Sequence, residues 1–293
     1  MSGIYWLASY PKSGNTWFRA FLRNLQEDGD APVDINDLQT GSIASARGWL
    51  DEVLGFDTAE LSPDEVERLR PAVYRWSAAH DEGIGYHKIH DAYIQTIDGE
   101  PLVSREATLG ALYLIRNPLD VAPSAANHWH CTLEEAVDKL CQANMALCKT
   151  RKALPDQVRQ RLGSWSEHVL SWVDAPGLNL QVIRYEDMLA SPLETFTRAA
   201  RFLQLPDDDQ RIAKAIRFSD FRELARQEAE KGFRERPRHT DSFFRVGRSG
   251  EGRQRLTAEQ IERLTQTHAE VMRRFGYLGD EGKPPDGQAA KSK

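Results

Sequence analysis

A lysine, a glycine and three short polar side chains follow the first apolar run of the chain. Residues Ile4–Ala8 are almost uniformly apolar, which predicts a strand buried on both faces. From Asn15 onward the apolar residues recur at helical spacing. The joint between the two reads Pro11-Lys12-Ser13-Gly14-Asn15-Thr16. A strand that enters a helix through such a turn builds an anion site, because free amides and the helix dipole favour negative charge and the lysine neutralises it.

Polar residues also follow two later apolar runs. Residues Ala111–Ile115 stop at Arg116-Asn117-Pro118, and residues Leu178–Ile183 run into Arg184-Tyr185-Glu186-Asp187. Because ligands of open parallel sheets lie beyond the carboxyl ends of the strands, these side chains are expected to converge with the first loop. The basic, glycine-containing segment 231–256 is predicted to be a long functional loop.

The first loop does not have the Walker A order, in which the lysine follows the last glycine, because Lys12 precedes Gly14. A magnesium-dependent phosphotransferase normally carries an acidic residue at the end of a neighbouring strand. Here Arg116 stands at that point, and a positive charge suits a second phosphate held by the protein alone. This pattern disfavours a nucleoside-phosphate kinase, which stays open as an alternative, and predicts no metal.

Together these motifs resemble those of the sulfotransferases that use 3′-phosphoadenosine 5′-phosphosulfate (PAPS). Tyr10–Trp17 resembles the family's 5′-phosphosulfate loop, and Arg116 with Ser124 eight residues later resembles its 3′-phosphate motif. Arg245–Gly250 is similar to its late Arg-Lys-Gly-x-x-Gly signature, and the motifs follow the family's order over residues 4–257. The resemblance implies a P-loop-NTPase-like sulfotransferase fold and sulfuryl transfer that releases the bisphosphate PAP.

The resemblance assigns PAPS to residues spread over all of these motifs. It implies that main-chain amides of the first loop and the Thr16 hydroxyl hold the phosphosulfate. It also implies that Arg116, Ser124 and the late loop, residues 245–250, hold the 3′-phosphate, and that aromatic residues hold the adenine. For Trp17 and Phe221 taken alone, core packing is the alternative. The full predicted set is Lys12, Ser13, Gly14, Asn15, Thr16, Trp17, Arg116, Ser124, Tyr185, Ser219, Phe221, Leu224, Arg245, Val246 and Gly247.

Three residues are predicted to act in catalysis by the same resemblance. His90 follows Lys88 by two, as the family's general base follows a lysine, and a histidine suits proton transfer near neutrality. Lys12 is expected to stabilise the leaving phosphate, and Lys88 to assist the sulfuryl group. His87, His128 and His130 are rivals for the base. The segment His128-x-His130-Cys131 could suggest a metal, but it lacks further ligands at a convincing spacing.

The acceptor is expected to be a small or medium organic molecule that offers a hydroxyl, less readily an amine. Its pocket is expected to be lined by four irregular segments, residues 28–61, 91–110, 127–150 and 231–244. The aromatic and histidine side chains in these segments favour such an acceptor; they are Trp49, Phe56, Tyr93, His128, Trp129 and Phe233. Some features resemble bacterial sulfotransferases of natural products. A non-catalytic PAPS- or PAP-binding protein stays open as a second alternative.

Two departures from the family pattern concern the late loop and the segment after it. Val246 stands where the family commonly has a lysine, so one contact to the 3′-phosphate is expected to be missing. Residues 253–262 resemble the family's short dimerisation motif with substitutions, which leaves a homodimer as an open alternative.

Strands that alternate with helices predict an α/β fold, a three-layer parallel sheet with helices on both faces. Capping boxes at Ser62 and Thr132 predict helix starts, the second helix running to about Ala153 and another opening at Pro155. Further helices are predicted over 192–204, 207–217, 219–230 and 257–275. Residues 1–278 are predicted to form a single domain, and residues 279–293 a disordered tail.

The composition of the 293 residues is that of a globular protein, with 40% hydrophobic and 28% charged residues. A net charge of −6 argues against nucleic-acid binding. The sequence has no apolar run long enough to span a membrane, no pattern of a signal peptide, and an odd number of cysteines, three. A cytoplasmic protein is therefore expected.

Overall fold

The computed structural model describes residues 2–38, 40–149 and 155–279. Its centre is a parallel sheet in the order β2-β1-β3-β6, and a second, two-stranded antiparallel sheet pairs β4 with β5. The strands are β1 (Gly3–Ser9), β2 (Ile84–Ile89), β3 (Thr108–Ile115), β4 (Ala146–Leu147), β5 (Gln160–Arg161) and β6 (Leu180–Arg184). The predicted α/β fold with a parallel sheet is confirmed.

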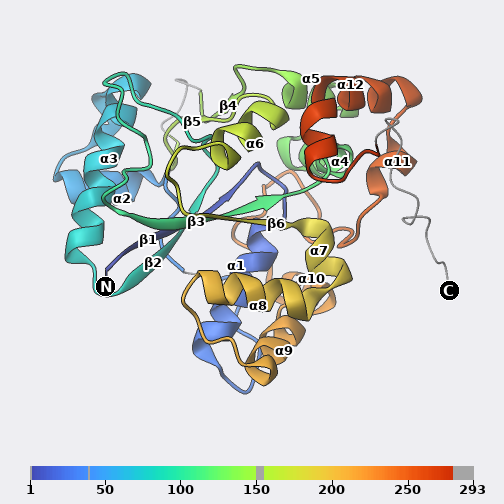
Figure 1. Cartoon of the computed structure of the whole chain (residues 1–293), viewed down its shortest axis with the longest axis horizontal. Coiled ribbons are helices and arrows are strands. Elements are labelled where there is room, and N and C mark those ends of the chain that lie inside the picture. Colours follow the sequence, from blue (N-terminus) through green and yellow to red (C-terminus); the bar gives the residue numbers. More distant parts are fainter. Residues whose placement is uncertain (1, 39, 150–154, 280–293) are drawn as a thin grey trace.

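Helices connect the strands and cover both faces of the sheet (Figure 1). They are α1 (Asn15–Glu27), α2 (Arg47–Leu54), η1 (Thr58–Glu60), α3 (Pro63–His80), α4 (Pro118–Trp129), α5 (Leu133–Cys141), α6 (Trp165–Val173), α7 (Tyr185–Ala190), α8 (Pro192–Phe202), α9 (Asp209–Phe218), α10 (Phe221–Lys231), α11 (Glu251–Arg255) and α12 (Ala258–Arg274).

Alternate residues of β1 face two separate cores, as expected for a strand buried on both sides. Trp6 packs with α3, α4, α5, α6 and α12, the layer drawn above the sheet in Figure 1. Leu7 packs with α1, α7, α8 and α9, the layer drawn below it. Both side chains are fully buried. The central strand is therefore enclosed, and its loop beyond Ser9 is held from two sides.

Local signals predicted the helix starts well. The capping boxes at Ser62 and Thr132 are both formed, the serine oxygen accepting from the Glu65 amide at 3.3 Å. Pro71 and Pro123 are accommodated inside α3 and α4. The four predicted helices after residue 190 are observed as α8, α9, α10 and α12.

Two helix predictions in the middle of the chain are wrong. The helix that begins after Thr132 ends at Cys141 and does not continue to Ala153, and residues 155–164 are not helical. There the backbone bonds to distant segments, for instance from the Val158 amide to the Ser45 carbonyl at 2.8 Å. Gly163 has φ +69°, outside the helical region, and Ser164 then caps α6.

Two further predictions concern a membrane-spanning segment and the C-terminal tail. Among the described residues no helix combines the length and the apolar character that a membrane crossing would need. Of the predicted tail only Gly279 belongs to the described residues, and residues 280–293 lie outside them. Helix α2 occupies part of the segment 28–61, for which no element was predicted.

Candidate active site

A cavity of about 670 Å³ opens at the carboxyl ends of the central strands. The loops after β1, β2, β3 and β6 contribute to its wall, together with the late loop between α10 and α11. Most of the predicted site residues line it; they are Lys12, Gly14, Asn15, Thr16, Trp17, Lys88, His90, Arg116, Ser124, Tyr185, Phe221, Leu224, Arg245, Val246 and Gly247. Ser13 and Ser219 are buried beside the cavity and do not line it.

The first loop is tied to the strand that precedes it. The Asn15 side-chain amide donates to the Leu7 carbonyl at 2.9 Å and to Ser9 Oγ at 3.2 Å. The first hydrogen bond of α1 runs from the Phe18 amide to the Gly14 carbonyl at 3.0 Å, so the amides of residues 15–17 precede the intrahelical bonds. Such free amides at a helix start are donors for an anion.

Gly14 lets the aromatic wall approach this loop. Its φ is +98°, and a Cβ added there would lie 2.7 Å from Cδ2 of Tyr185. Trp17, one turn later, packs edge to face against Tyr185 with ring centroids 5.6 Å apart. Together with Phe221 and Leu224 these rings form an apolar end of the cavity suited to a flat base.

Lys12 is held in a strained and cationic setting. Its φ is +73°, a left-handed conformation that is uncommon for a residue with a side chain and typical of functional loops. Its Nζ lies 4.0 Å from the centroid of the Phe243 ring. Burial, with Lys88 and Arg116 nearby, lowers the pKa of Lys12 to about 7. Within the described part of the chain no carboxylate forms an ion pair with this ammonium, although the charge of Glu235 acts to raise its pKa.

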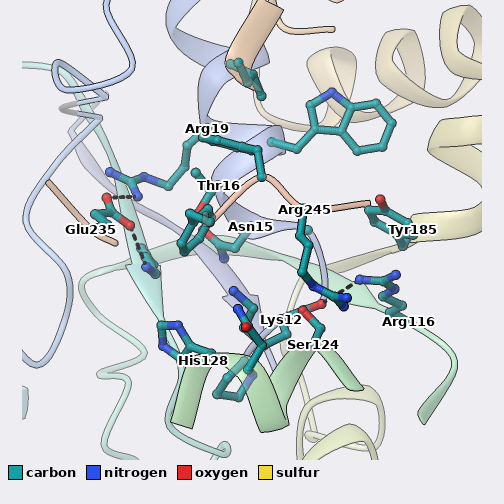
Figure 2. Close-up of a pocket in the computed structure, with 18 of the residues that line it drawn as sticks. Lys12, Asn15, Thr16, Arg19, Arg116, Ser124, His128, Tyr185, Glu235 and Arg245 are labelled. Atoms are coloured by element: carbon teal, nitrogen blue, oxygen red, sulfur yellow. Dashed lines mark hydrogen bonds and ion pairs between the residues drawn. The ribbon is translucent and has the colours of Figure 1, made fainter. Parts of the chain in front are cut away.

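Arg116 joins three parts of the site. Its guanidinium donates to the carbonyls of Lys12 (3.3 Å) and Arg248 (3.2 Å), and it lies 4.2 Å over the Tyr185 ring centroid. Its Nε is buried and has no hydrogen-bond partner among the described residues. Figure 2 shows Arg116 near Ser124 and Arg245, so two cations and a hydroxyl gather at one end of the cavity.

The late loop is anchored to α4 by the side chain of Asp120. Its carboxylate accepts from the amides of Gly250 and Gly252, both at 2.8 Å. Gly252 allows this contact, because a Cβ there would lie 2.0 Å from the Leu119 carbonyl oxygen. Asp120 thus fixes the loop that brings Arg245 over the cavity.

The same loop presses against the aromatic end of the cavity. Gly247 has φ +62°, and a Cβ there would lie 2.3 Å from the Phe221 ring. Arg245 is oriented by an ion pair with Glu251 at 2.6 Å. Val246, at a position where the resemblance leads one to expect a lysine, lines the cavity and adds no charge.

The His90 imidazole has a defined tautomer. Its Nδ1 lies 2.8 Å from the Ser9 carbonyl, which can only accept, so Nδ1 carries the proton and Nε2 keeps its lone pair. Burial, followed by the charge of Lys88, lowers the pKa of His90 well below 6.5. Behind it, His168 Nε2 donates to the His90 carbonyl at 2.9 Å. His90 is therefore neutral near pH 7 and able to accept a proton.

Lys88 is joined by a partner that sequence reasoning missed. Glu235, from the late loop, pairs with Lys88 Nζ at 3.2 Å and with Arg19 at 2.6 Å (Figure 2). Burial opposes ionisation of Glu235, but the two cations outweigh it and lower the pKa of this carboxyl to about 2. No local pattern signals this contact, because the three residues come from distant parts of the chain.

The other histidines face different surroundings. His87 Nδ1 lies 2.9 Å from the Ser42 carbonyl, and its ring stacks on Trp49 at 4.5 Å, away from the cavity lining. His128 lines the cavity, and burial, then Lys12 and Lys88, lower its pKa to about 3. Within the described ranges no group of three or more His, Cys, Asp or Glu side chains could hold a metal ion.

The remaining wall differs in part from the predicted acceptor pocket. Segments 28–61, 127–150 and 231–244 contribute to it, whereas none of the lining residues comes from 91–110. The aromatic residues that line it are Phe243 and Phe244, and of the side chains singled out from the sequence only His128 does so. Ser219 turns its hydroxyl to the Ala215 carbonyl at 2.9 Å instead of the cavity.

Comparisons with known proteins agree with this geometry. Curated relatives include cytosolic sulfotransferase 17 of Arabidopsis thaliana, 24% identical over 94% of this chain and 76% of that protein, and sulfotransferase 2A6 of Rattus norvegicus, 25% identical over 92% of this chain and 84% of that protein.

Solved structures share the fold. Mouse sulfotransferase SULT7A1 complexed with PAP has a TM-score of 0.58 at 19% identity, covering 96% of this chain and 86% of that one. Retinol dehydratase in complex with androsterone and PAP has a TM-score of 0.59 at 18% identity, covering 92% and 80%. The model of the sulfotransferase domain family matches residues 4–276. The chain, with its parallel sheet and its cation-lined cavity at the strand ends, belongs to the sulfotransferase family.

Proposed function

We propose that this sulfotransferase moves a sulfuryl group from PAPS to a hydroxyl of a small or medium organic acceptor and releases PAP. The observation that carries the proposal is one cavity that contains two groups of anion-binding residues and a neutral histidine. The first group is the loop with Lys12 and the free amides at the start of α1, and the second consists of Arg116, Ser124 and Arg245. A nucleotide with phosphates at both its 5′ and 3′ positions matches this division.

The residues present fit such a nucleotide. The free amides at the start of α1 and Lys12 would hold the 5′ group, and Arg116 with its unpartnered Nε would hold the 3′-phosphate. Trp17, Tyr185 and the neighbouring rings would enclose the adenine. Ser13 would contribute its main-chain amide, since its hydroxyl is buried beside the cavity. Ser219 would act by supporting Phe221, not by contact.

For this reaction the protein mainly has to position the two substrates and stabilise charge. PAPS supplies an activated sulfuryl group, whose bond to the phosphate oxygen breaks as the bond to the acceptor oxygen forms. His90 Nε2 takes the acceptor proton, and the Ser9 carbonyl keeps the ring in the required tautomer. Lys12 neutralises the charge that grows on the leaving phosphate, a contact typically worth about 3 kcal/mol. Lys88, held by Glu235, adds positive charge beside His90.

The proposal extends to the domain organisation, the cellular location, the oligomeric state and the acceptor. Residues 1–278 would form one domain, and the protein would act in the cytoplasm, as the name of the plant relative suggests for that protein. A homodimer through residues 253–262 is an alternative that sedimentation can decide. The acceptor would be neutral and partly aromatic, since Phe243 and Phe244 line its side of the cavity.

The proposal is tested by calorimetric titration of the protein with PAP, ATP and PAPS, each with and without magnesium. We expect tight binding of PAP that does not depend on magnesium, and weaker binding of ATP. A screen of hydroxyl acceptors with labelled PAPS should then yield a sulfate ester. Magnesium-dependent preference for ATP would support the kinase alternative, and PAP binding without turnover on any acceptor would support a binding protein.

PAP binding is expected to take up about one proton above pH 7. Because burial and neighbouring cations lower the pKa of Lys12 to about 7 in the free protein, Lys12 loses its proton as the pH rises past 7. A phosphate beside it favours the charged form and raises that pKa again. The affinity for PAP should therefore fall above pH 7. Calorimetry in buffers of different ionisation enthalpy measures the uptake.

Lys12→Arg is the control for this proton uptake, because an arginine stays charged throughout this range. The variant should bind PAP without proton uptake. If it takes up as many protons as the wild type, the titrating group is a different one, and Lys88 is then the first to replace.

A further inference from the structure

The side-chain amide of Gln160, in the wall of the cavity on the acceptor side, has an oxygen without a hydrogen-bond partner among the described residues. The Gln160 side chain lines the cavity although the residue is only 1% exposed. Its Nε2 donates to Gln157 Oε1 at 3.0 Å and lies 3.9 Å from Cys148 Sγ. Its Oε1 is buried and has no hydrogen-bond partner among the described residues. Buried amide oxygens are nearly always paired, so this oxygen has the capacity to accept from a donor group on a bound ligand.

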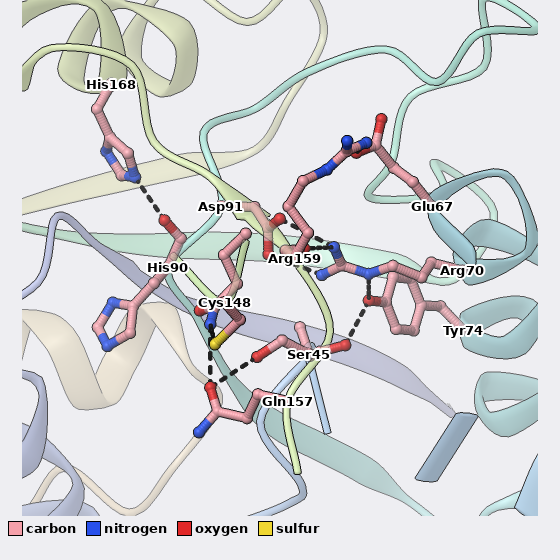
Figure 3. Close-up of polar contacts among 12 residues, drawn as sticks. Ser45, Glu67, Arg70, Tyr74, His90, Asp91, Cys148, Gln157, Arg159 and His168 are labelled. Atoms are coloured by element: carbon pink, nitrogen blue, oxygen red, sulfur yellow. Dashed lines mark hydrogen bonds and ion pairs between the residues drawn. The ribbon is translucent and has the colours of Figure 1, made fainter. Parts of the chain in front are cut away.

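The orientation of this amide is set by its neighbours. Gln157 Oε1 also accepts from Ser45 Oγ at 3.1 Å, and Ser45 is fully buried. Ser45 in turn accepts from the Val158 amide at 2.8 Å through its carbonyl, which fixes the segment that carries Gln157. Because Gln160 Nε2 is bonded to Gln157, the atom of the Gln160 amide that remains unpaired is Oε1. Figure 3 shows this chain of contacts through Ser45, Gln157 and Cys148.

Gln160 belongs to the same cavity lining as the proposed base, His90. The Ala92 amide donates to the Arg161 carbonyl at 2.8 Å, which joins the residues just after His90 to those just after Gln160. Both His90 and Gln160 line the same cavity. An acceptor whose reacting hydroxyl lies at His90 can therefore present a second group to Gln160.

Several lining residues of the cavity are uncharged. Ile43, Leu147 and Phe244 are apolar, and Gln157 carries no charge. His128 is also neutral near pH 7, since its pKa is lowered to about 3. An amide oxygen accepts, so the second group of the acceptor is a hydrogen-bond donor such as a hydroxyl or an N–H.

We propose that Gln160 is a specificity-determining residue, which selects acceptors that carry a second hydrogen-bond donor apart from the hydroxyl that is sulfated. The inference rests on the proposed function, because it takes the cavity to hold PAPS and an acceptor together. A site built to bond a donor rejects an analogue of the same shape that lacks it, because its buried oxygen is then left unpaired.

Three naphthalenes of similar shape test this selection on the PAP-loaded protein. 2,7-Dihydroxynaphthalene offers a second donor, 7-methoxy-2-naphthol offers only an acceptor oxygen there, and 2-naphthol offers neither. We expect the diol to bind about tenfold to 100-fold more tightly than the methoxy compound, as measured by calorimetry. Gln160→Met, which keeps the shape of the side chain, should abolish this preference while PAP affinity stays unchanged.

The control is Gln266→Met, which replaces an exposed glutamine of α12 that does not line the cavity. It should keep the wild-type preference. Equal binding of diol and methoxy compound to the wild type, binding of no naphthalene, or an equal loss for all of them in Gln160→Met would each overturn the inference. Failure of the wild type to bind PAP would instead contradict the proposed function. Thermal unfolding checks that Gln160→Met is folded.

Discussion

Replacing His90 with alanine is expected to lower kcat by about 100- to 10,000-fold and to leave the affinity for PAP within about threefold of wild type. The imidazole is the neutral base in the cavity with a fixed tautomer, because Nδ1 donates to the Ser9 carbonyl and Nε2 stays free. Nothing in its contacts places it on the nucleotide's phosphates. Single-turnover kinetics with PAPS and an acceptor, together with PAP calorimetry, measure the two effects.

His80→Ala is the matched control for this variant, because His80 lies at the end of α3 and does not line the cavity. It should change neither kcat nor PAP affinity. Loss of PAP binding in His90→Ala would show that His90 belongs to the nucleotide site. Unchanged turnover would transfer the role of base to His128, which also lines the cavity.

The acid limb of the pH profile tests the same residue independently. A base must be unprotonated to act, and burial holds the pKa of His90 well below 6.5. The activity of the wild type should therefore persist as the pH falls through 6.5 and decline only below it. A decline centred at or above 6.5 would contradict this assignment.

Replacing Arg70 with methionine is expected to lower the free energy of unfolding by about 3–5 kcal/mol, a large share of the stability of a typical domain. Arg70 and Asp91 form an ion pair that is almost completely inaccessible to solvent, with two bonds of 2.9 and 2.7 Å (Figure 3). The guanidinium also donates to Tyr74, whose hydroxyl reaches the Ala44 carbonyl at 2.7 Å. Without Arg70 the buried Asp91 carboxylate has no compensating charge.

Arg68 offers a control on the same helix. It pairs with Asp98 at the surface, where both side chains are about half exposed, and such pairs contribute between about 0 and 1 kcal/mol. Arg68→Met should therefore have a small effect in chemical denaturation. The double variant Arg70→Met/Asp91→Leu should recover most of the lost stability, since no charge is left unpaired. Equal losses in both single variants would contradict the argument.

Asp91 directly follows His90, so the ion pair also bears on the site. Trp172 Nε1 donates to the Asp91 carbonyl at 3.0 Å, and His168 donates to that of His90. The turn that presents the base is thus held from behind by buried partners. The sequence shows the lysine–histidine spacing at this turn and gives no sign of its support, because Arg70 lies on α3.

Contacts between neighbouring residues made much of the fold predictable. The strands, the capped helix starts and the turn from β1 into α1 each follow from a few consecutive side chains. Residues 142–149 and 155–164 could not be predicted in this way. Their apolar spacing suits a helix, but the backbone of residues 155–164 bonds to Ser45 and other distant residues, and that competition is absent from the local pattern.

The strand-to-helix loop with Lys12, the arginine at the next strand end and the order of the motifs could be predicted from the amino-acid sequence, because these features depend on adjacent residues. Three features could be seen only in the folded protein: Glu235 joins Lys88 to Arg19, His87 stacks on Trp49 while His90 lines the cavity, and Gln160 has an unpaired oxygen. Burial and pairing depend on residues that folding brings together from distant parts of the chain, so no local pattern reveals them.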